Sequence, residues 1–261
     1  MRLSFVIPTR NQARFIGKCL DQCLAQNITD SEIIVVDGLS TDHTVEVLQS
    51  YGDRITFTSE RDSGQSDAID KGIGRARGDV IAWINSDDYY PRANVLERVL
   101  AAFDGDPRND IVYGRGEMVD VDGKALGPYP VLVRPTPRDI VIRGSSGVLQ
   151  PAVFFRRSLY KAVGGLDHAL HYTMDYDLWI RMFERARAVE FLPEVLACAT
   201  YHPDAKSVRT MRKQIIEAAR VKSRHAAKLG LGPIDRARML ANVASMFAYW
   251  GAVRLGLKRA V

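Results

Sequence analysis

The sequence predicts an α/β protein built on a doubly wound, mostly parallel sheet. Short runs of β-branched and aromatic residues alternate with segments of helical spacing over the first hundred residues. The run "EIIVVD" (32–37) is almost continuously apolar, as expected of a strand covered on both faces. The segments between successive runs are long enough to hold a helix, which parallel strands require. These three observations together favour the parallel arrangement.

The first half of the chain supplies four expected strands and three expected helices. The strands are expected at residues 3–8, 32–37, 54–60 and 79–85. Three- and four-residue apolar spacing predicts helices at residues 13–26, 40–51 and 64–78. In a sheet of this kind ligands bind beyond the carboxyl ends of the strands.

The pattern loosens after about residue 110, which predicts a smaller, mixed second half. We expect a strand pair at 110–124, a loop at 134–139, a strand and short helix at 150–165, a helix at 175–186, and one or two strands at 188–202. Further helices are expected at 206–228 and 235–257. The predicted organisation is therefore a domain at residues 1–205 followed by a helical C-terminal extension at residues 206–261.

Charge is divided unevenly between these two parts. The net charge of the chain is +5, but residues 206–261 hold 13 Lys and Arg against Glu217 and Asp235, a net +11. Residues 1–205 are left with −6. A basic extension on an acidic body predicts an anionic surface as its partner, and we expect no nucleic-acid partner.

The cysteines and the hydropathy exclude several classes of protein. The three cysteines, Cys19, Cys23 and Cys198, lack a second ligand pair, so they indicate buried residues of a reducing compartment rather than a zinc site. The apolar run at the N-terminus is too short for a signal peptide. No stretch of 18 uncharged apolar residues predicts a spanning helix, and we expect a cytoplasmic protein.

Carboxylates gather where two of the expected parallel strands end. Asp37 closes the second strand, and Asp87 and Asp88 follow the fourth in "IAWINSDDYYP". Such neighbouring charges repel each other, and oxygen-liganded Mg²⁺ or Mn²⁺ would remove that cost. A cation with open positions suits a diphosphate ligand. The alternative is an Asp-rich turn that only caps a chain reversal.

Five successive segments resemble the family-2 glycosyltransferases of the GT-A fold. They are "FVIPTRNQARFI", "EIIVVDGLSTDHT", "DSGQSDAIDKGIGRARGDVIAWINSDD", "QPAVFFRRSLYKAVGGLD" and "MDYDLWIRM". Each is weak alone, but five in the family's order and spacing are specific, and they cover about residues 1–205. The resemblance implies an inverting enzyme that uses a nucleotide-sugar donor, of the kind found in bacterial cell-surface polysaccharide synthesis.

The resemblance also implies a nucleotide-sugar site along the carboxyl edge of the sheet. The implied contacts are Pro8, Thr9, Arg10, Asp37, Asp62, Gln65, Asp67, Lys71, Asp87 and Gln150. Asp37 is suited to accept from a uracil N–H or ribose hydroxyls, and Lys71 to meet a phosphate. Helix N-capping is the alternative for Gln65 and Asp67.

The segment "NSDD" resembles the DXD metal motif of the family, with Asn85 in place of its first acid. The resemblance implies Asp88 as a direct ligand of Mn²⁺ or Mg²⁺. Asp87 would contact the metal or the donor's ribose or sugar. His202, in "TYHPDAKSV", is a candidate third ligand or phosphate contact, and a plain surface histidine fits equally well.

The segment "TMDYDLWIRM" holds the candidate for the catalytic base. The family has an acidic pair at the start of this helix, and Met174 replaces its first member here. Asp175 matches the second member, which takes the proton of the acceptor hydroxyl, and Asp177 is the reserve candidate. The alternative is that both acids merely favour the positive end of the helix.

These implications predict a metal-dependent inverting glycosyltransferase. We expect a UDP-sugar donor and a saccharide or lipid-linked saccharide acceptor. The departures at Asn85 and Met174 keep open a second hypothesis, a catalytically degenerate nucleotide-sugar-binding module. A dehydrogenase is disfavoured because no G-x-G-x-x-G follows the first strand.

Residues 233–261 predict an amphipathic basic helix. Leu240, Val243, Phe247 and Trp250 recur at three- and four-residue steps between basic residues. A helix of this type binds an anionic membrane, which would place the protein peripherally on the inner face of the plasma membrane. A helix docked on the core, or on a second subunit in a homodimer, fits the same pattern.

Overall fold

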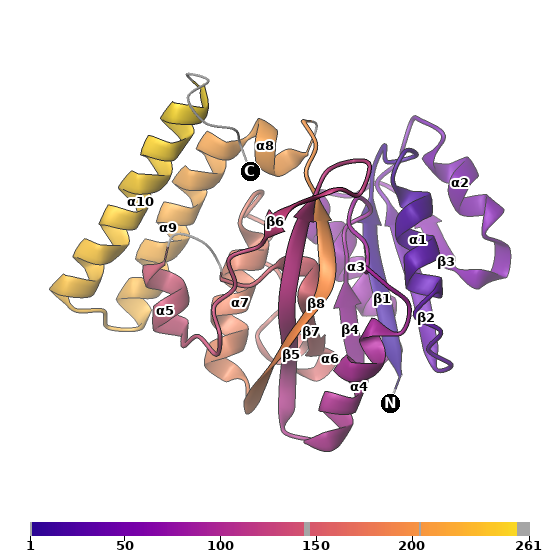
Figure 1. Cartoon of the computed structure of the whole chain (residues 1–261), viewed down its shortest axis with the longest axis horizontal. Coiled ribbons are helices and arrows are strands. Elements are labelled where there is room, and N and C mark those ends of the chain that lie inside the picture. The colour runs from indigo at the N-terminus through magenta and orange to yellow at the C-terminus, as the bar shows by residue number, and fades with distance from the viewer. Residues whose placement is uncertain (1, 144–146, 204, 255–261) are drawn as a thin grey trace.

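One eight-stranded sheet runs through the described part of the molecule, and helices cover both of its faces (Figure 1). The structure, a computed structural model, describes residues 2–143, 147–203 and 205–254. The strands are β1 (Leu3–Thr9), β2 (Ser31–Asp37), β3 (Thr56–Ser59), β4 (Val80–Trp83), β5 (Asn109–Val119), β6 (Ala125–Pro128), β7 (Val153–Arg156) and β8 (Ala188–Thr200). Their order is β3-β2-β1-β4-β7-β5-β6, with β8 paired to β5.

The pairing divides the sheet into the two halves that the sequence predicts. Strands β3, β2, β1 and β4 are parallel to one another. Beyond β4 the pairing becomes mixed, because β7 is antiparallel to both β4 and β5, and β6 is antiparallel to β5. Strand β8 runs parallel to β5. The predicted fold class, a doubly wound nucleotide-binding half with a smaller mixed half, is confirmed.

The helices lie on both faces of the sheet, and two of them stand beyond it at one end of the molecule (Figure 1). They are α1 (Ile16–Leu24), α2 (Thr44–Ser50), α3 (Gln65–Arg75), α4 (Val95–Gly105), α5 (Pro137–Ile142), α6 (Arg157–Ala162), α7 (Met174–Arg185), α8 (Lys206–Arg209), α9 (Met211–Lys228) and α10 (Pro233–Arg254). Short 3₁₀ turns occupy Gly52–Arg54 and Gln150–Ala152. In Figure 1, α9 and α10 stand at the end of the molecule opposite α1 and α2.

Alternating side chains of the central strands feed two separate cores. In β1, Val6 belongs to the core that α3, α7 and α9 complete, whereas Phe5 and Ile7 belong to the core that α1, α2 and α4 complete. Successive strand side chains point to opposite faces, so a strand covered on both sides must be apolar throughout. This requirement explains the uninterrupted apolar runs of the sequence.

Two short elements differ from the sequence-based expectation. The prediction of a loop at 134–139 is wrong for its last three residues, because α5 begins at Pro137. The Thr136 hydroxyl and the Asp139 carboxylate form a capping box at its first turn, which is the pattern that starts a helix. Helix α4 was not expected, and its buried face packs against β5.

The basic extension packs on the body of the protein. Val221 of α9 and Met239 of α10 belong to the same core as α7. Arg138 of α5 and Asp235 of α10 form a two-pronged ion pair, with N–O distances of 2.9 and 2.8 Å. Residues 255–261 of the predicted extension lie outside the described residues. Within the described part, no helix is both long enough and apolar enough to cross a membrane.

The contact between α3 and β1 gives a test of the fold. A Cβ at Gly72 would lie 2.5 Å from Cγ1 of Val6, so Gly72→Ala should lower the free energy of unfolding, by about 1–3 kcal/mol. Gly74 lies two residues further along α3, and a Cβ added there would have nothing within 4 Å. Gly74→Ala should therefore stabilise the protein by about 0.5–1 kcal/mol. Urea denaturation measures both, and equal effects of the two substitutions would contradict the packing.

Candidate active site

A cleft of about 650 Å³ opens where the parallel strands end. It receives side chains from the turn after β1, the segment before α3, the turn after β4, the start of α7 and the start of α8. The predicted site residues that line it are Pro8, Thr9, Arg10, Asp62, Gln65, Asp87, Asp88, Gln150 and Asp175. The predicted residues Asp37, Asp67, Lys71, Asp177 and His202 are not among its lining.

The turn after β1 is held by the loop after β2. The backbone amide of Asn11 donates to the Ser40 hydroxyl (2.7 Å), and the Asn11 side chain accepts from the Thr41 amide (2.8 Å). The Asp42 carboxylate accepts from the Ala13 amide (3.1 Å). Thr9 is thereby fixed at the cleft, and its buried hydroxyl oxygen has no hydrogen-bond partner among the described residues. A buried polar atom facing a cleft is suited to a ligand.

Asp37 serves this loop rather than the cleft. Its carboxylate is fully buried and accepts from the Ser40 amide (3.0 Å), the Ser40 hydroxyl and the Ser59 hydroxyl (2.6 Å). The residue therefore ties the ends of β2 and β3 together. Its predicted contact with the base or ribose is not supported by this arrangement.

Asp62 brings a carboxylate to the cleft next to Gly38. A Cβ at position 38 would lie 2.3 Å from Oδ2 of Asp62, so only glycine leaves room for this carboxylate. The other oxygen of Asp62 accepts from the Gly64 amide (3.0 Å). The Arg10 side chain lies on the same glycine. A carboxylate acceptor and a cationic side chain thus lie at the same end of the cleft.

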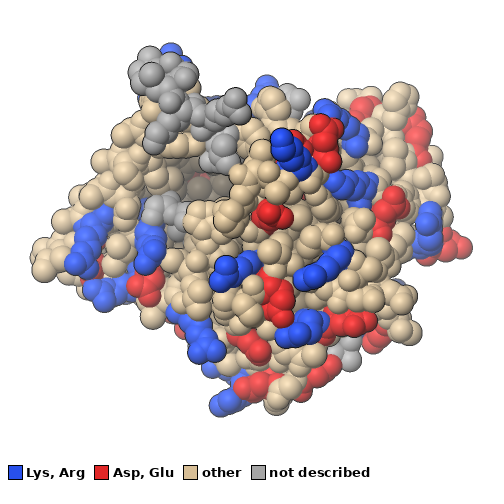
Figure 2. All heavy atoms as spheres, in the orientation of Figure 1, with Lys and Arg blue, Asp and Glu red and all other residues tan. Residues whose placement is uncertain are grey.

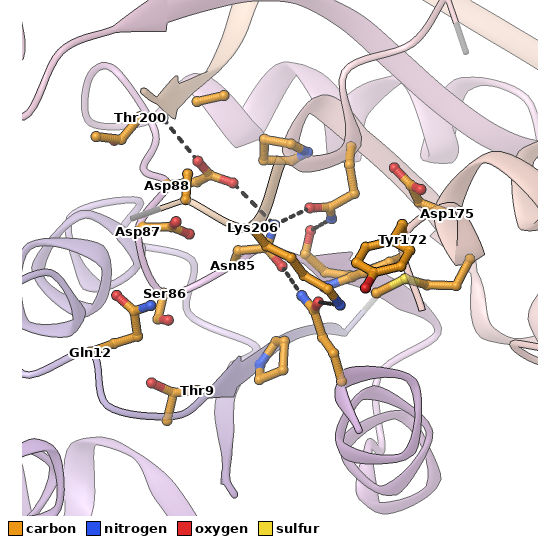
Figure 3. A pocket seen from close by; sticks show the side chains of 18 of the residues that line it. Thr9, Gln12, Asn85, Ser86, Asp87, Asp88, Tyr172, Asp175, Thr200 and Lys206 are labelled. Atoms are coloured by element: carbon orange, nitrogen blue, oxygen red, sulfur yellow. Dashed lines mark hydrogen bonds between the residues drawn. The ribbon is translucent and has the colours of Figure 1, made fainter. Parts of the chain in front are cut away.

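Asn85 is the centre of a hydrogen-bond network on the cleft floor (Figure 3). Its side-chain oxygen accepts from Gln65 (3.0 Å), and its amide nitrogen donates to Gln150 (3.0 Å) and to Asp88 (3.3 Å). Gln150 in turn donates to the carbonyl of Trp83 (2.6 Å). An aspartate at position 85 could not make these two donations, so asparagine fits this network.

Asp88 is a buried carboxylate, and none of the described residues forms an ion pair with it. Its Oδ1 accepts from the amide of Thr200 at 3.0 Å. Burial raises the pKa of Asp88 well above its usual range, and the neighbouring charge of Asp87 raises it further. Oδ2 of Asp87 lies at hydrogen-bond distance, 3.1 Å, from Nε2 of His202. His202 is 4% exposed and stacks on Phe15, so this buried ring fixes the position of the Asp87 carboxylate.

Asp67 and Lys71 face each other one turn apart on α3. The Lys71 ammonium lies 3.1 Å from the Asp67 carboxylate and donates to the carbonyl of Arg61 (2.8 Å). The Asp67 carboxylate also accepts from the Ser63 amide (2.9 Å). The Asp67 carboxylate thus holds the backbone of the residue before Gly64, the N-cap of α3, and the ammonium of Lys71 is engaged away from the cleft.

The two acids at the start of α7 have different surroundings. Asp175 lines the cleft, and burial raises its pKa above the ordinary range. Asp177 is 1% exposed and pairs with Arg181 (2.7 Å), Arg224 (2.6 Å) and His225 (2.7 Å). Burial alone would raise the pKa of Asp177, but these hydrogen bonds and charges hold it well below its usual range. Only Asp175 is placed to meet a ligand in the cleft.

Lys206 occupies the middle of the cleft (Figure 3). Its ammonium donates to Gln65 (3.3 Å) and lies 5.5 Å from the ring centre of Tyr172. Desolvation of the ammonium lowers the pKa of Lys206. The sequence did not identify the nearby lining residues Gln12, Tyr172 and Gln214. Their positions follow from tertiary packing, and no motif marks them.

The cleft can hold a divalent cation only with help from a ligand. In the described residues no group of three or more His, Cys, Asp or Glu side chains is arranged to bind a metal. Asp87 and Asp88 offer carboxylate oxygens, and the raised pKa of Asp88 shows that its negative charge is poorly compensated. Mg²⁺ is commonly held by one or two carboxylates together with substrate phosphates and water. The donor set fits that mode of binding.

The sheet order is that of the GT-A fold, and comparisons with solved structures agree. S. aureus TarS (residues 1–349) in complex with UDP superimposes with a TM-score of 0.69, at 19% identity, over 99% of this chain and 76% of that chain. The mannosyltransferase PcManGT from Pyrobaculum calidifontis, in complex with GDP-Man and Mn²⁺, gives 0.64 at 18% identity, over 99% and 81%. At these identities the likeness concerns the fold.

Sequence similarity identifies the family. The profile described as Glycosyl transferase family 2 matches residues 4–164. The uncharacterized glycosyltransferase RT0329 of Rickettsia typhi is 32% identical over 235 residues, covering 82% of this chain and 68% of that protein. The chain belongs to glycosyl transferase family 2 and is a nucleotide-sugar glycosyltransferase, as the sequence motifs predicted.

Proposed function

We propose that this protein is a metal-dependent inverting glycosyltransferase in which Asp175 is the catalytic base. The observation that carries the proposal is the placement of carboxylates in one cleft. Asp87 and Asp88 stand on one side and Asp175 on the other, with Lys206 between them (Figure 3). A leaving diphosphate and an attacking hydroxyl need these two opposite positions.

The nucleotide would bind at the end of the cleft formed by Thr9, Arg10 and Asp62. The Asp62 carboxylate can accept from a base N–H or from ribose hydroxyls, and the buried hydroxyl of Thr9 lacks a hydrogen-bond partner within the described part of the chain. A UDP-sugar is the donor we expect. The solved structures of similar fold were determined with UDP and with GDP-Man, so both bases fit a cleft of this architecture.

Asp88, with Asp87 beside it, would hold Mn²⁺ or Mg²⁺. A divalent cation bound there would neutralise the charge that develops on the departing diphosphate. Lys206 brings a further positive charge into the same cleft from α8. Its lowered pKa arises from desolvation, which also strengthens its attraction for an anionic group.

Asp175 would take the proton of the acceptor hydroxyl as that oxygen attacks the anomeric carbon. A base on the face opposite the leaving group gives inversion of configuration. The raised pKa of Asp175 makes it a stronger base than an exposed aspartate, and it stays ionised only above that raised pKa. Transfer should therefore be lost as the pH falls through a value above the ordinary range for aspartate.

Replacing the base separates catalysis from binding. Asp175→Asn keeps the shape of the side chain but cannot accept a proton, so transfer should fall by about 10²- to 10⁴-fold. Binding of the nucleotide, measured by calorimetry, should stay close to that of the wild type. Retained transfer would refute the base assignment. Tight nucleotide binding by a wild-type protein that transfers no sugar would instead favour a binding module.

Replacing the expected metal ligand tests the cation site. With UDP present, Mn²⁺ at 100 times its dissociation constant should stabilise the wild type by about 2.7 kcal/mol. Asp88→Asn should abolish most of that Mn²⁺-dependent rise in melting temperature. Asp104→Asn, an exposed acid on α4, is the control and should keep it. A full Mn²⁺ response in the Asp88 variant would exclude Asp88 as a ligand.

The acceptor would be a saccharide or a lipid-linked saccharide at an anionic membrane surface. In α10, Ile234 is 72% and Leu240 61% exposed, although they are large apolar side chains. Figure 2 shows Lys and Arg gathered toward the end of the molecule where α10 begins, while much of the visible surface beyond carries no charge. Exposed apolar groups beside basic ones suit the interface of an anionic bilayer.

Vesicle sedimentation tests this membrane contact. The double substitution of Ile234→Ser and Leu240→Ser removes two apolar side chains, each worth about 1.5–3 kcal/mol when buried. Sedimentation with vesicles of anionic phospholipid should fall by at least about tenfold. Val133→Ser is the matched control, because Val133 is 60% exposed but lies outside α10. Equal sedimentation of all three proteins would contradict the proposal and leave a subunit contact as the use of α10.

A further inference from the structure

One carboxylate of α9, that of Glu217, contacts the turn that precedes α7. Oε1 of Glu217 accepts from the amides of Tyr172 (2.7 Å) and Thr173 (2.8 Å) and from the Thr173 hydroxyl (2.9 Å). Its Oε2 accepts from the amide of His171 (3.1 Å). Four donors from three successive residues therefore converge on a single side chain that is 45 residues away along the chain.

Glu217 satisfies the amides that lead into α7. Thr173 stands at the N-cap position, but its hydroxyl makes no capping bond to its own helix and donates instead to Glu217. Amides at and before a helix start need an acceptor, and an anion there is favoured by the helix dipole. Glu217 meets both needs from outside the helix.

The consequence falls on Asp175, two residues beyond Thr173. Since Glu217 already satisfies the amides of residues 171–173, the carboxylate of Asp175 is not required to cap them. A second anchor follows one turn later, where Arg224 and His225 of α9 bind Asp177. Asp175 is thus held between two contacts with α9, at the wall of the cleft.

Met174, the first residue of α7, stands where the family resemblance implies an acid. This position lies directly before the base, and the methionine here is buried. Glu217 delivers a carboxylate to the same turn from the C-terminal helical extension. Glu217 therefore adds a carboxylate from α9 to a helix start whose first turn already carries Asp175 and Asp177.

We propose that Glu217 is a positioning residue for catalysis, which fixes the turn of residues 171–173 and thereby holds Asp175 toward the acceptor hydroxyl. The inference rests on the proposed role of Asp175 as base. It assigns to the C-terminal extension a part in the reaction itself, beyond any contact with a membrane.

The charge of Glu217 also acts on Asp175. Lys206 from α8 lowers the pKa of Asp175, and Glu217 from α9 raises it. The other titratable groups near Asp175 are His171, in the turn that Glu217 holds, and Asp87 and Asp88, which line the same cleft. Removing the negative charge of Glu217 should lower the pKa of Asp175. A base with a lower pKa remains ionised to lower pH, so the acid limb of the rate profile should move to lower pH.

Two substitutions separate geometry from charge. Glu217→Ala removes all four acceptor contacts, and kcat should fall by about 10- to 100-fold, because small displacements of a catalytic group are costly. The KM for the donor should stay within about twofold, since the nucleotide end of the cleft is untouched. Glu217→Gln keeps one acceptor oxygen without the charge. Its kcat at the pH plateau should fall less, and its acid limb should move to lower pH.

Glu184→Gln is the matched control, because Glu184 is an exposed acid on α7 itself. It should keep the wild-type kcat and pH profile. A wild-type kcat in Glu217→Ala, or a loss confined to the donor KM, would overturn the inference. If the alanine variant does not fold, an unmoved acid limb in the folded Glu217→Gln protein would overturn it. Retained transfer in Asp175→Asn would instead refute the proposed base, whatever the Glu217 variants do.

Discussion

The parallel strands of this protein are covered by helices on both faces, and the rest of the structure depends on that constraint. With both faces buried, a central strand favours apolar side chains until it ends. Polar residues therefore collect in the turns at the carboxyl ends, where β1, β2 and β4 stop side by side. The cleft lies along this edge, outside the two cores.

Within the edge, the acids divide according to the partners that packing gives them. Asp37 and Asp177 are saturated by hydrogen-bond donors and serve structure. Asp88 is buried and Asp175 is half-buried, both with fewer donors around them, and burial raises the pKa of each. Unsatisfied burial is costly unless a ligand relieves it. That imbalance distinguishes the acids suited to chemistry from those that hold loops and helices together.

Much of the fold could be predicted because it rests on local periodicity. The apolar runs predicted the strands of the first half, and the motifs predicted the family and nine residues of the cleft lining. The pattern failed at α5, where a proline-rich segment resembled a loop although Thr136 and Asp139 form a capping box. It also failed for side chains such as Lys71, because a motif specifies which residue is present and not which neighbour it will pair with.

The sequence by itself determined the class of protein, and its motifs predicted the edge of the sheet that would meet the donor and Asp175 as the candidate base, with Asp177 in reserve. Tertiary structure decided which of these acids lines the cleft. The motif ranks Asp175 before Asp177, but it does not show which side chains surround each of them. The packing of α9 brings Arg224 and His225 to Asp177 and Glu217 to the turn before Asp175. Side-chain partners distant in sequence are set by the fold as a whole, and electrostatics follows those partners.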